Sequence, residues 1–484
     1  MLLIILIALP VFTAFTIFLI GKKSNSRKSI EIMALLGVIT ELLVGLAVVF
    51  APATNTSEWI SRYIYVDELG ALFLLIVLLL GSFGTMYSVF YLRNEKEART
   101  EEPKKIGNYF ALYQLFMLSM IIAVSAYNVL LLWIAVEATT LSSAFLINFF
   151  NRPAAIEAAW KYVIINSVAL LLCLFGVFLF LAGTEHALPG FTLFDWNNLS
   201  HVVHLINPDV LKVAFVFILV GYGTKMGLAP MQNWLPDAHS QAPVPISALL
   251  SGGLLNIALL ALLRFKGLVD ISLGAQFAQT LLLFFGISSM LIAAMLILNQ
   301  KEYKRMLAYS SIEHMGIIIF GIALGGMATV AALLHALYHS LAKSVLFLSS
   351  GNIALSYHSY EIKSVRGMLR TIPVTGILFL GGILAAAGVP PFGTFFTKFT
   401  ILAVGFELHP ILTALALAAL ALAFVGLMKH ASWMLFGENP TEEKQSEAKE
   451  SFVPIMALFI LLLILSLYIP GPLMSLVNNA VLHL

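Results

Sequence analysis

The sequence predicts an all-α, polytopic membrane protein with about fourteen transmembrane helices. Hydrophobic residues make up 60% of its 484 positions, charged residues only 11%, and the mean hydropathy is +0.96. These values exclude an ordinary soluble domain. Apolar runs of about 18 residues or more, each able to cross ~30 Å of hydrocarbon as a helix, recur along the whole chain. They lie near 1–20, 30–50, 68–92, 109–126, 128–149, 160–183, 209–239, 244–265, 275–299, 306–325, 328–350, 373–406, 410–436 and 452–471.

The seventh and twelfth runs are interrupted by Gly and Pro, and each contains a lysine. Lys225 lies in VAFVFILVGYGTKMGLAP, and Lys398 lies in GVPPFGTFFTKF. A charge at the bilayer centre costs roughly 2.5–3.5 kcal/mol on insertion scales, so such residues usually mark ion or proton paths. Broken segments at matching places in two halves of a chain indicate a transport site. We therefore expect two inverted five-helix repeats, with broken helices 7 and 12.

This pattern predicts four parts of the chain. They are N-terminal helices 1–3 over 1–108, a first five-helix repeat over 109–265, a second over 266–436, and a loop with helix 14 over 437–484.

The distribution of basic residues predicts the orientation. The loop GKKSNSRKS follows the first span, and alternation from there places 18 of the 27 Lys and Arg residues in cytoplasmic loops. Basic loops are retained in the cytoplasm. We therefore expect a multi-pass protein of the cell (cytoplasmic) membrane with both termini outside.

Several kinds of chemistry are excluded. The single cysteine, Cys173, cannot form an intrachain disulfide, and no Cys cluster could hold iron–sulfur or structural zinc. The chain contains neither GxxxxGK[ST] nor HExxH. We expect no cofactor, no metal and no catalytic residue in this chain, and any redox chemistry to lie on another one. What remains are ionisable residues inside apolar runs. Glu41 is one of them, equally compatible with a headgroup-level and a partner-facing place.

In the first half, Glu137 lies mid-span in LLLWIAVEATTLSSAFLI, among hydroxyls that can bind a carboxylate or water. An unused buried acid would be expensive, which favours a function. Lys161 lies at the start of the sixth span. Its side chain could either reach the membrane–water interface or take part in the function, and the spacing favours neither. Lys225 is deeper, beside a helix break whose free carbonyls can bind a cation or water. Asp237 and His239 follow in a bend, where a loop role and a proton relay are both open.

In the second half, AYSSIEHMG brings His314 into the tenth span. The eleventh span carries His335, His339 and Lys343 at i, i+4 and i+8, on one helical face. Three aligned titratable groups on an apolar helix favour a proton wire. Lys398 closes this half, 173 residues after Lys225.

The chain resembles the antiporter-like membrane subunits of respiratory complex I, multisubunit cation/proton antiporters and membrane-bound nickel–iron hydrogenases. The motifs that carry the resemblance are WIAVEATTLSS, KMGLAPMQNWLPDAHSQAPVPISALLSG, KRMLAYSSIEHMG, HALYHSLAKSVLFLSSG and GVPPFGTFFTKF. AYSSIEHMG and RPAAIEAAWKY are most similar to the hydrogenase-4 component F branch. The resemblance implies fourteen helices, inverted repeats and a hydrated polar axis along the membrane midplane.

Carried over by position, the resemblance implies that Glu137 pairs with Lys225 and that Lys398 lies on the exit side. It also assigns His335, His339, Lys343 and His314 to the polar stripe between them. One departure concerns the eighth helix, where several relatives have Lys or His. Here SALLSGGLLNIALLALLR offers only Ser251 and Asn256, which cannot titrate. Water must bridge this stretch, or His239 must take the place of the missing group.

Three function classes follow. The first is a proton-translocating, or sodium-translocating, subunit of a redox-driven complex related to hydrogenase or complex I. Its partners would be other membrane subunits, a peripheral redox module and the lipid bilayer, and no nucleic acid. The second is a subunit of a multisubunit sodium/proton antiporter without a redox partner. The third, a stand-alone solute transporter, is disfavoured because no Arg or Trp cluster is present to bind a solute.

Overall fold

The structure is a computed structural model that describes residues 1–23, 26–50, 63–99, 101–184, 194–437, 447 and 449–482. In these ranges all regular elements are helices, and β pairing is limited to three isolated bridges. The α-helices are α1 (Leu2–Lys23), α2 (Arg27–Phe50), α4 (Glu68–Asn94), α5 (Lys96–Arg99), α6 (Pro103–Ser125), α7 (Val129–Ile147), α8 (Pro153–Ala182), α9 (Trp196–Val202), α10 (Pro208–Met226), α11 (Trp234–Gln241), α12 (Val244–Leu249), α13 (Leu255–Leu273), α14 (Ala275–Ile297), α15 (Tyr303–Leu324), α16 (Gly326–Tyr357), α17 (Met368–Thr371), α18 (Pro373–Ala387), α19 (Gly393–Leu408), α20 (Pro410–Phe436), α21 (Phe452–Leu467) and α22 (Gly471–Leu482).

The prediction of an all-α membrane protein is confirmed at this level. Eleven helices in the described part of the chain are long and apolar enough to cross a membrane, and a twelfth span results if α21 and α22 are counted together. Those two helices meet at an angle of 74°, so the last predicted span is sharply bent at its end.

The helix ends follow local rules. Asn128 caps α7 by accepting from the amides of Leu130 and Leu131, and Asp67 caps α4 by accepting from Gly70. Proline opens α6, α8, α10, α18 and α20, where its missing N–H costs nothing.

The two predicted helix breaks are present. α10 ends at Gly227 and α18 ends at Gly388, with φ of 79° and 78°, a left-handed conformation that favours glycine at a helix C-terminus. After each break the chain resumes as a second helix, α11 or α19. Lys225 lies before its break and Lys398 after its own. The two glycines are 161 positions apart, whereas the two lysines are 173 positions apart. Aligning the halves on their lysines therefore does not align their helix breaks.

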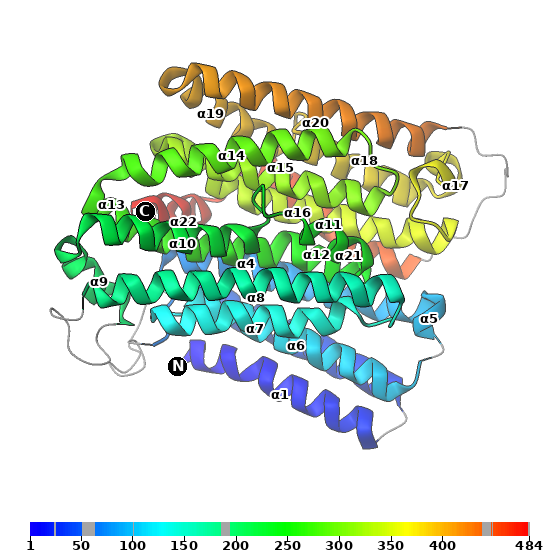
Figure 1. Ribbon diagram of the computed structural model, residues 1–484. Helices are drawn as coiled ribbons and strands as arrows, with labels where there is room; N and C mark the ends of the chain where they lie inside the picture. Colours follow the sequence, from blue (N-terminus) through cyan, green and yellow to red (C-terminus); the bar gives the residue numbers. More distant parts are fainter. Residues whose placement is uncertain are drawn as a thin grey trace.

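The helices run side by side along one common direction (Figure 1). Short helices α5 and α17 lie at one end of the bundle, here called the α5/α17 end, and α9 lies at the other, the α9 end. The most buried spans are α15, α16 and the α12–α13 segment, in which 94%, 100% and 100% of the residues of the apolar stretch are buried. In α1, α2 and α20 that share is only 33%. The innermost helices therefore carry the predicted histidine stripe.

Candidate functional site

The first polar centre surrounds Lys225, near the end of α10. Its Nζ is fully buried and donates to Thr140 Oγ1 at 2.6 Å and to the Tyr162 hydroxyl at 3.0 Å, while lying 4.9 Å from the centroid of the Tyr162 ring. Thr140 in turn donates to Glu137 Oε2 at 3.5 Å, and Ser167 donates to Glu137 Oε1 at 2.7 Å. Glu137 and Lys225 thus belong to one cluster, but Thr140 stands between the carboxylate and the ammonium.

The second polar centre surrounds Lys398 on α19. Its Nζ forms an ion pair with Glu313 Oε1 at 3.0 Å and donates to the carbonyl of Ala386, at the end of α18, at 3.2 Å. The other carboxylate oxygen of Glu313 lies 3.7 Å from His314 Nε2. An ion pair in a low-dielectric interior stabilises the ammonium and the carboxylate together.

Glu313 is a site residue that the sequence prediction missed. It stands in AYSSIEHMG beside His314, but its role was not recognised because helical neighbours at i and i+1 point in different directions. One signal could have found it. Glu313 precedes Lys398 by 85 residues, the same separation that joins Thr140 to Lys225.

A chain of imidazoles leads to Lys398. His314 Nδ1 lies 2.8 Å from His335 Nε2, and His335 Nδ1 lies 2.7 Å from Thr397 Oγ1. We assign the single Thr397 hydroxyl hydrogen to the backbone carbonyls of its own helix, each 3.1 Å from Oγ1, so that the hydroxyl accepts from His335. His335 Nδ1 therefore carries the hydrogen, and its Nε2 accepts from His314. The hydrogen bonds run in one direction, from His314 to Thr397, the residue before Lys398.

His339 and Lys343 complete the predicted stripe on α16. The His339 ring lies 4.7 Å from the His314 ring, and neither of its nitrogens has a hydrogen-bond partner among the described residues. Lys343 Nζ donates to the carbonyl of Leu307 at 2.8 Å and to the hydroxyl of Ser310. The structure therefore brings all three α16 residues together with α15, as their spacing predicted.

Hydroxyl and amide groups occupy the stretch between the two centres. The Ser251 and Ser311 hydroxyls lie 2.7 Å apart, and Asn256 donates to Ser340 at 2.7 Å. Ser251 belongs to a π-helical turn, Leu250–Leu254, between α12 and α13. His239, on α11, is fully buried and lies under the electrostatic influence of Lys343.

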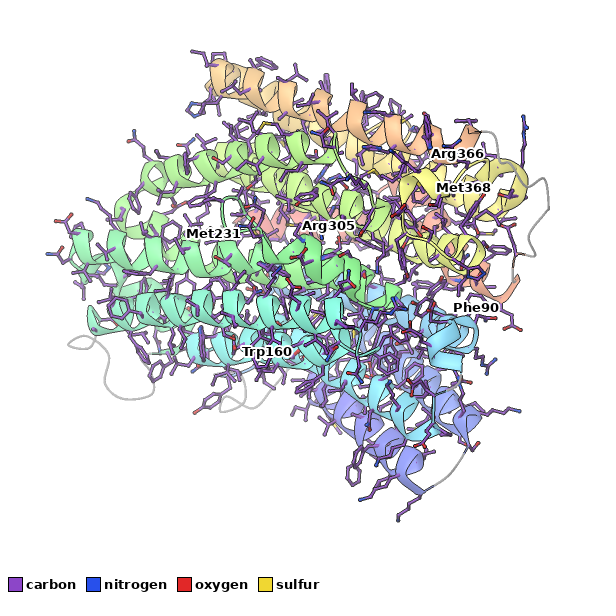
Figure 2. The ribbon with its side chains drawn as sticks, turned by 45° about the vertical axis from the view of Figure 1, so that its right-hand side comes forward. Phe90, Trp160, Met231, Arg305, Arg366 and Met368 are labelled. Atoms are coloured by element: carbon purple, nitrogen blue, oxygen red, sulfur yellow. The ribbon has the colours of Figure 1, made fainter. Side chains whose placement is uncertain are left out.

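Lys161 does not join this cluster. It lies on an exposed face of α8, paired with Glu157 at 2.6 Å and with Asp237 at 3.3 Å, and Asp237 also binds Arg305 at 2.7 Å. Trp160 and Arg305 mark this face, which is turned toward the reader in Figure 2. Glu41 is different, because it is 1% exposed and neither of its carboxylate oxygens has a hydrogen-bond partner among the described residues.

The geometry suits the transfer of protons. Buried amines and imidazoles alternate with hydroxyls and with the carboxylates of Glu313, which is buried, and Glu137, which is half-buried. In the described part of the chain, no group of three or more His, Cys, Asp or Glu is arranged to hold a metal ion.

Comparison with known proteins places the chain. Residues 126–425 match the family described as NADH:quinone oxidoreductase/Mrp antiporter, TM. The chain is 37% identical to a hydrogenase-4 component F homolog from Methylacidiphilum infernorum, over 85% of this chain and 86% of that protein. It is 28% identical to NADH-quinone oxidoreductase subunit N from Desulforudis audaxviator, over 82% and 78%. It is 27% identical to the Na(+)/H(+) antiporter subunit A1 of Staphylococcus aureus, of which it spans about half, 51%.

Solved structures share the fold. A chain of the membrane-bound sulfane sulfur reductase, an archaeal respiratory membrane complex, has a TM-score of 0.87 at 24% identity, covering 99% of this chain and 97% of that one. A chain of the Mrp complex from Dietzia sp. has a TM-score of 0.80 at 18% identity, covering 98% and 96%. A chain of respiratory complex I from Thermus thermophilus has a TM-score of 0.76 at 23% identity, covering 96% and 97%. The chain belongs to the NADH:quinone oxidoreductase/Mrp antiporter transmembrane family of antiporter-like membrane subunits.

Proposed function

We propose that this chain translocates protons as a membrane subunit of a redox-driven complex related to the hydrogenase branch. One observation carries the proposal: two buried lysine centres and four buried histidines lie inside the helix bundle, with three of the histidines on α15 and α16, which are among its most buried spans. Idle ionisable groups at such depth would cost several kcal/mol, and an ion or proton path accounts for them. The identity to the hydrogenase-4 component F homolog, 37%, supports the choice of branch.

The pathway uses Glu137, Lys225, His239, His339, Lys343, His314, His335 and Lys398. A proton held on Lys225 is released when the Glu137 cluster rearranges and moves along water past His239 and Ser251 to the stripe on α16. A proton that arrives at His314 Nε2 displaces the Nδ1 hydrogen toward His335, whose own Nδ1 hydrogen moves on toward Thr397 and reaches the Lys398 amine after Lys398 has released its proton. The transfer leaves each ring with its hydrogen on Nε2, and rotation of the imidazole returns that hydrogen to the Nδ1 position for the next proton. Charge interactions with neighbouring subunits drive the cycle, because fields act strongly in a low dielectric.

The proposed topology is fourteen spans with two inverted five-helix repeats. The eleven candidate spans include α12–α13 as one, and adding α21–α22 and the broken spans α10–α11 and α18–α19 gives fourteen. An even number puts both termini on one side, which we propose is the outside of the cytoplasmic membrane. The clustering of basic loops at the α5/α17 end supports this orientation.

Cysteine labelling tests the topology. In a Cys173→Ser background, Asn197→Cys on α9 and Ser364→Cys near α17 are both partly or fully exposed. Under the proposal an impermeant maleimide added outside intact cells labels the first and spares the second. Labelling of both from the same side would contradict it.

The partners proposed are other membrane subunits and a peripheral redox module. Purification of the complex from native membranes, followed by mass spectrometry, tests this directly. Recovery of a nickel–iron or quinone-reducing module supports the proposal. Recovery of small membrane proteins alone would favour the sodium/proton antiporter instead.

A further inference from the structure

Lys304 is a buried lysine outside the pathway proposed above. By sequence it belongs to a group of loop charges with Lys301 and Arg305, but it is the second residue of α15 and only 1% exposed, whereas Lys301 is exposed. Its Nζ donates to the carbonyl of Ala242 at 2.7 Å and lies 5.1 Å from the centroid of the Tyr360 ring. Among the described residues it forms no ion pair. A carbonyl and an aromatic face bind the ammonium, but no carboxylate within the described ranges contacts it to stabilise its charged form.

On one side, Lys304 faces charged groups of the α5/α17 end. Glu302, at the start of α15, Glu95, at the end of α4, and Arg152 are near enough to act on it electrostatically. Burial raises the pKa of the Glu95 carboxyl above its usual value, and Arg152 lowers it again in part. A carboxyl of this kind, close to an aqueous end, can collect a proton and deliver it.

The carbonyl that accepts from Lys304, that of Ala242, lies three residues after His239, at the end of the same helix. The His239 Nδ1 lies 2.8 Å from the carbonyl of Leu235, and because a carbonyl only accepts, Nδ1 carries the ring hydrogen. His239 Nε2 is therefore a free acceptor in the neutral ring, fully buried and without a partner among the described residues. Both Lys304 and Lys343 are near enough to this ring to act on it electrostatically.

Further residues of α15 connect Lys304 with the polar stripe on α16. The carbonyl of Leu307, three residues after Lys304, accepts from Lys343, and His314 follows seven residues after Leu307, two turns further along the helix. α15 thus extends from the α5/α17 end to the imidazole chain.

We propose that Lys304 and His239 form the proton-loading branch of this chain, which feeds Lys343 from the α5/α17 end. This rests on the proposed function. One N–H bond of the Lys304 ammonium breaks, and the proton moves through water to His239 Nε2. The protonated ring then gives that proton to the neutral amine of Lys343, and the Lys304 amine takes a new one from Glu95 or Glu302. The branch supplies the titratable step that Ser251 and Asn256 cannot.

A purely structural role is the competing explanation. Ala242 is the C-terminal cap of α11, and a cation there stabilises the end of a helix. Arginine separates the two roles, because a guanidinium keeps the charge and the hydrogen bond but does not release its proton.

The test uses the intact complex in inverted membrane vesicles, with a fluorescent pH-gradient dye as the readout. The vesicles are driven by the electron donor of the co-purifying module, or by a sodium gradient if only membrane subunits co-purify. Lys304→Arg should assemble with wild-type thermal stability and lose transport by roughly 100-fold, the contribution of a positioned proton carrier. His239→Asn, which keeps a donor for Leu235 but cannot titrate, should lose a similar amount. Lys301→Met is the matched control and should transport normally.

Wild-type transport in a stably assembled Lys304→Arg or His239→Asn variant overturns the inference and leaves Lys304 as a helix cap. Lys225→Ala and Lys398→Leu/Glu313→Gln, made in parallel, separate this from failure of the proposed function. If they lose transport while Lys304→Arg keeps it, only the loading branch fails. If they too transport normally, the proposed pathway itself fails.

Discussion

The two lysine centres each hold an ammonium group inside the helix bundle, but the ammonium groups have different partners. Lys398 is bound directly to a carboxylate, Glu313, at 3.0 Å. Lys225 is bound to two hydroxyls, and the carboxylate of Glu137 is one hydrogen bond further away. Both pairs span 85 residues, so Thr140 stands at the same sequence distance before Lys225 as Glu313 does before Lys398.

The difference indicates a division of labour. A buried ammonium with only hydroxyl partners is poorly compensated, so small movements of a nearby carboxylate change its protonation. An ammonium in a direct ion pair is held charged until that pair opens. Lys225 is therefore expected to respond to events in neighbouring subunits, and Lys398 to hold the proton until it leaves.

The largest effect is expected at Lys225. Lys225→Ala should remove coupled transport, by roughly 100-fold or more, while the complex assembles, because the residue supplies a titratable charge and not packing. Lys225→Arg should fail as well, since its guanidinium stays charged in the usable pH range. Proton uptake by inverted vesicles measures the rate, and blue-native gels measure assembly. Full transport in Lys225→Ala would remove this residue from the pathway.

A second effect, nearly as large, is expected at Lys398. Changing it to leucine alone would strand the Glu313 carboxylate without its cation, at a cost of about 3–5 kcal/mol. Lys398→Leu/Glu313→Gln avoids that and should assemble without transporting. Lys398→Glu keeps a titratable group, because two adjacent carboxyls share one proton, and should retain partial transport with a shifted pH optimum. If the Leu/Gln variant transports like the wild type in the same assay, protons leave by another route.

Exchanging the partners tests the comparison itself. Thr140→Glu places a carboxylate directly on Lys225, as in the second half, and should slow transport roughly three- to tenfold by holding the ammonium. Glu313→Thr makes the second half resemble the first and should weaken proton retention at Lys398 by a comparable factor. The double variant reverses the roles of the halves. Equal rates in all three, measured against Thr140→Ser, would show that these partners do not set the proton affinity.

Much of this arrangement could be read from the sequence, for physical reasons that differ by feature. Apolar length predicted the helices, and the i, i+4, i+8 spacing of His335, His339 and Lys343 fixed their common face. The breaks were visible because only Gly and Pro interrupt such runs. The pairing of Glu313 with Lys398 was not predicted, because these two residues meet only through the packing of α15 against α19.

Burial was also hard to predict where charges cluster at helix ends. Lys304 and Arg305 are adjacent in sequence, yet the first is buried and the second pairs with Asp237 on the surface. Adjacent residues of a helix point about 100° apart, which is enough to bury Lys304 and leave Arg305 at the surface. The assignment of Lys161 to the pathway stays a prediction for the same reason.

The smallest effect is expected at Lys161. Its side chain is 47% exposed and is paired with Glu157 and Asp237, whereas Lys225 is fully buried. Exposed ion pairs contribute about 0–1 kcal/mol, so Lys161→Met should change transport less than about threefold. The same vesicle assay checks this, with Lys212→Met, another exposed and paired lysine, as the control. If Lys161→Met instead abolishes transport like Lys225→Ala, the exposed face of α8 is covered in the assembled complex. Lys161 would then carry protons across an interface with a neighbouring subunit.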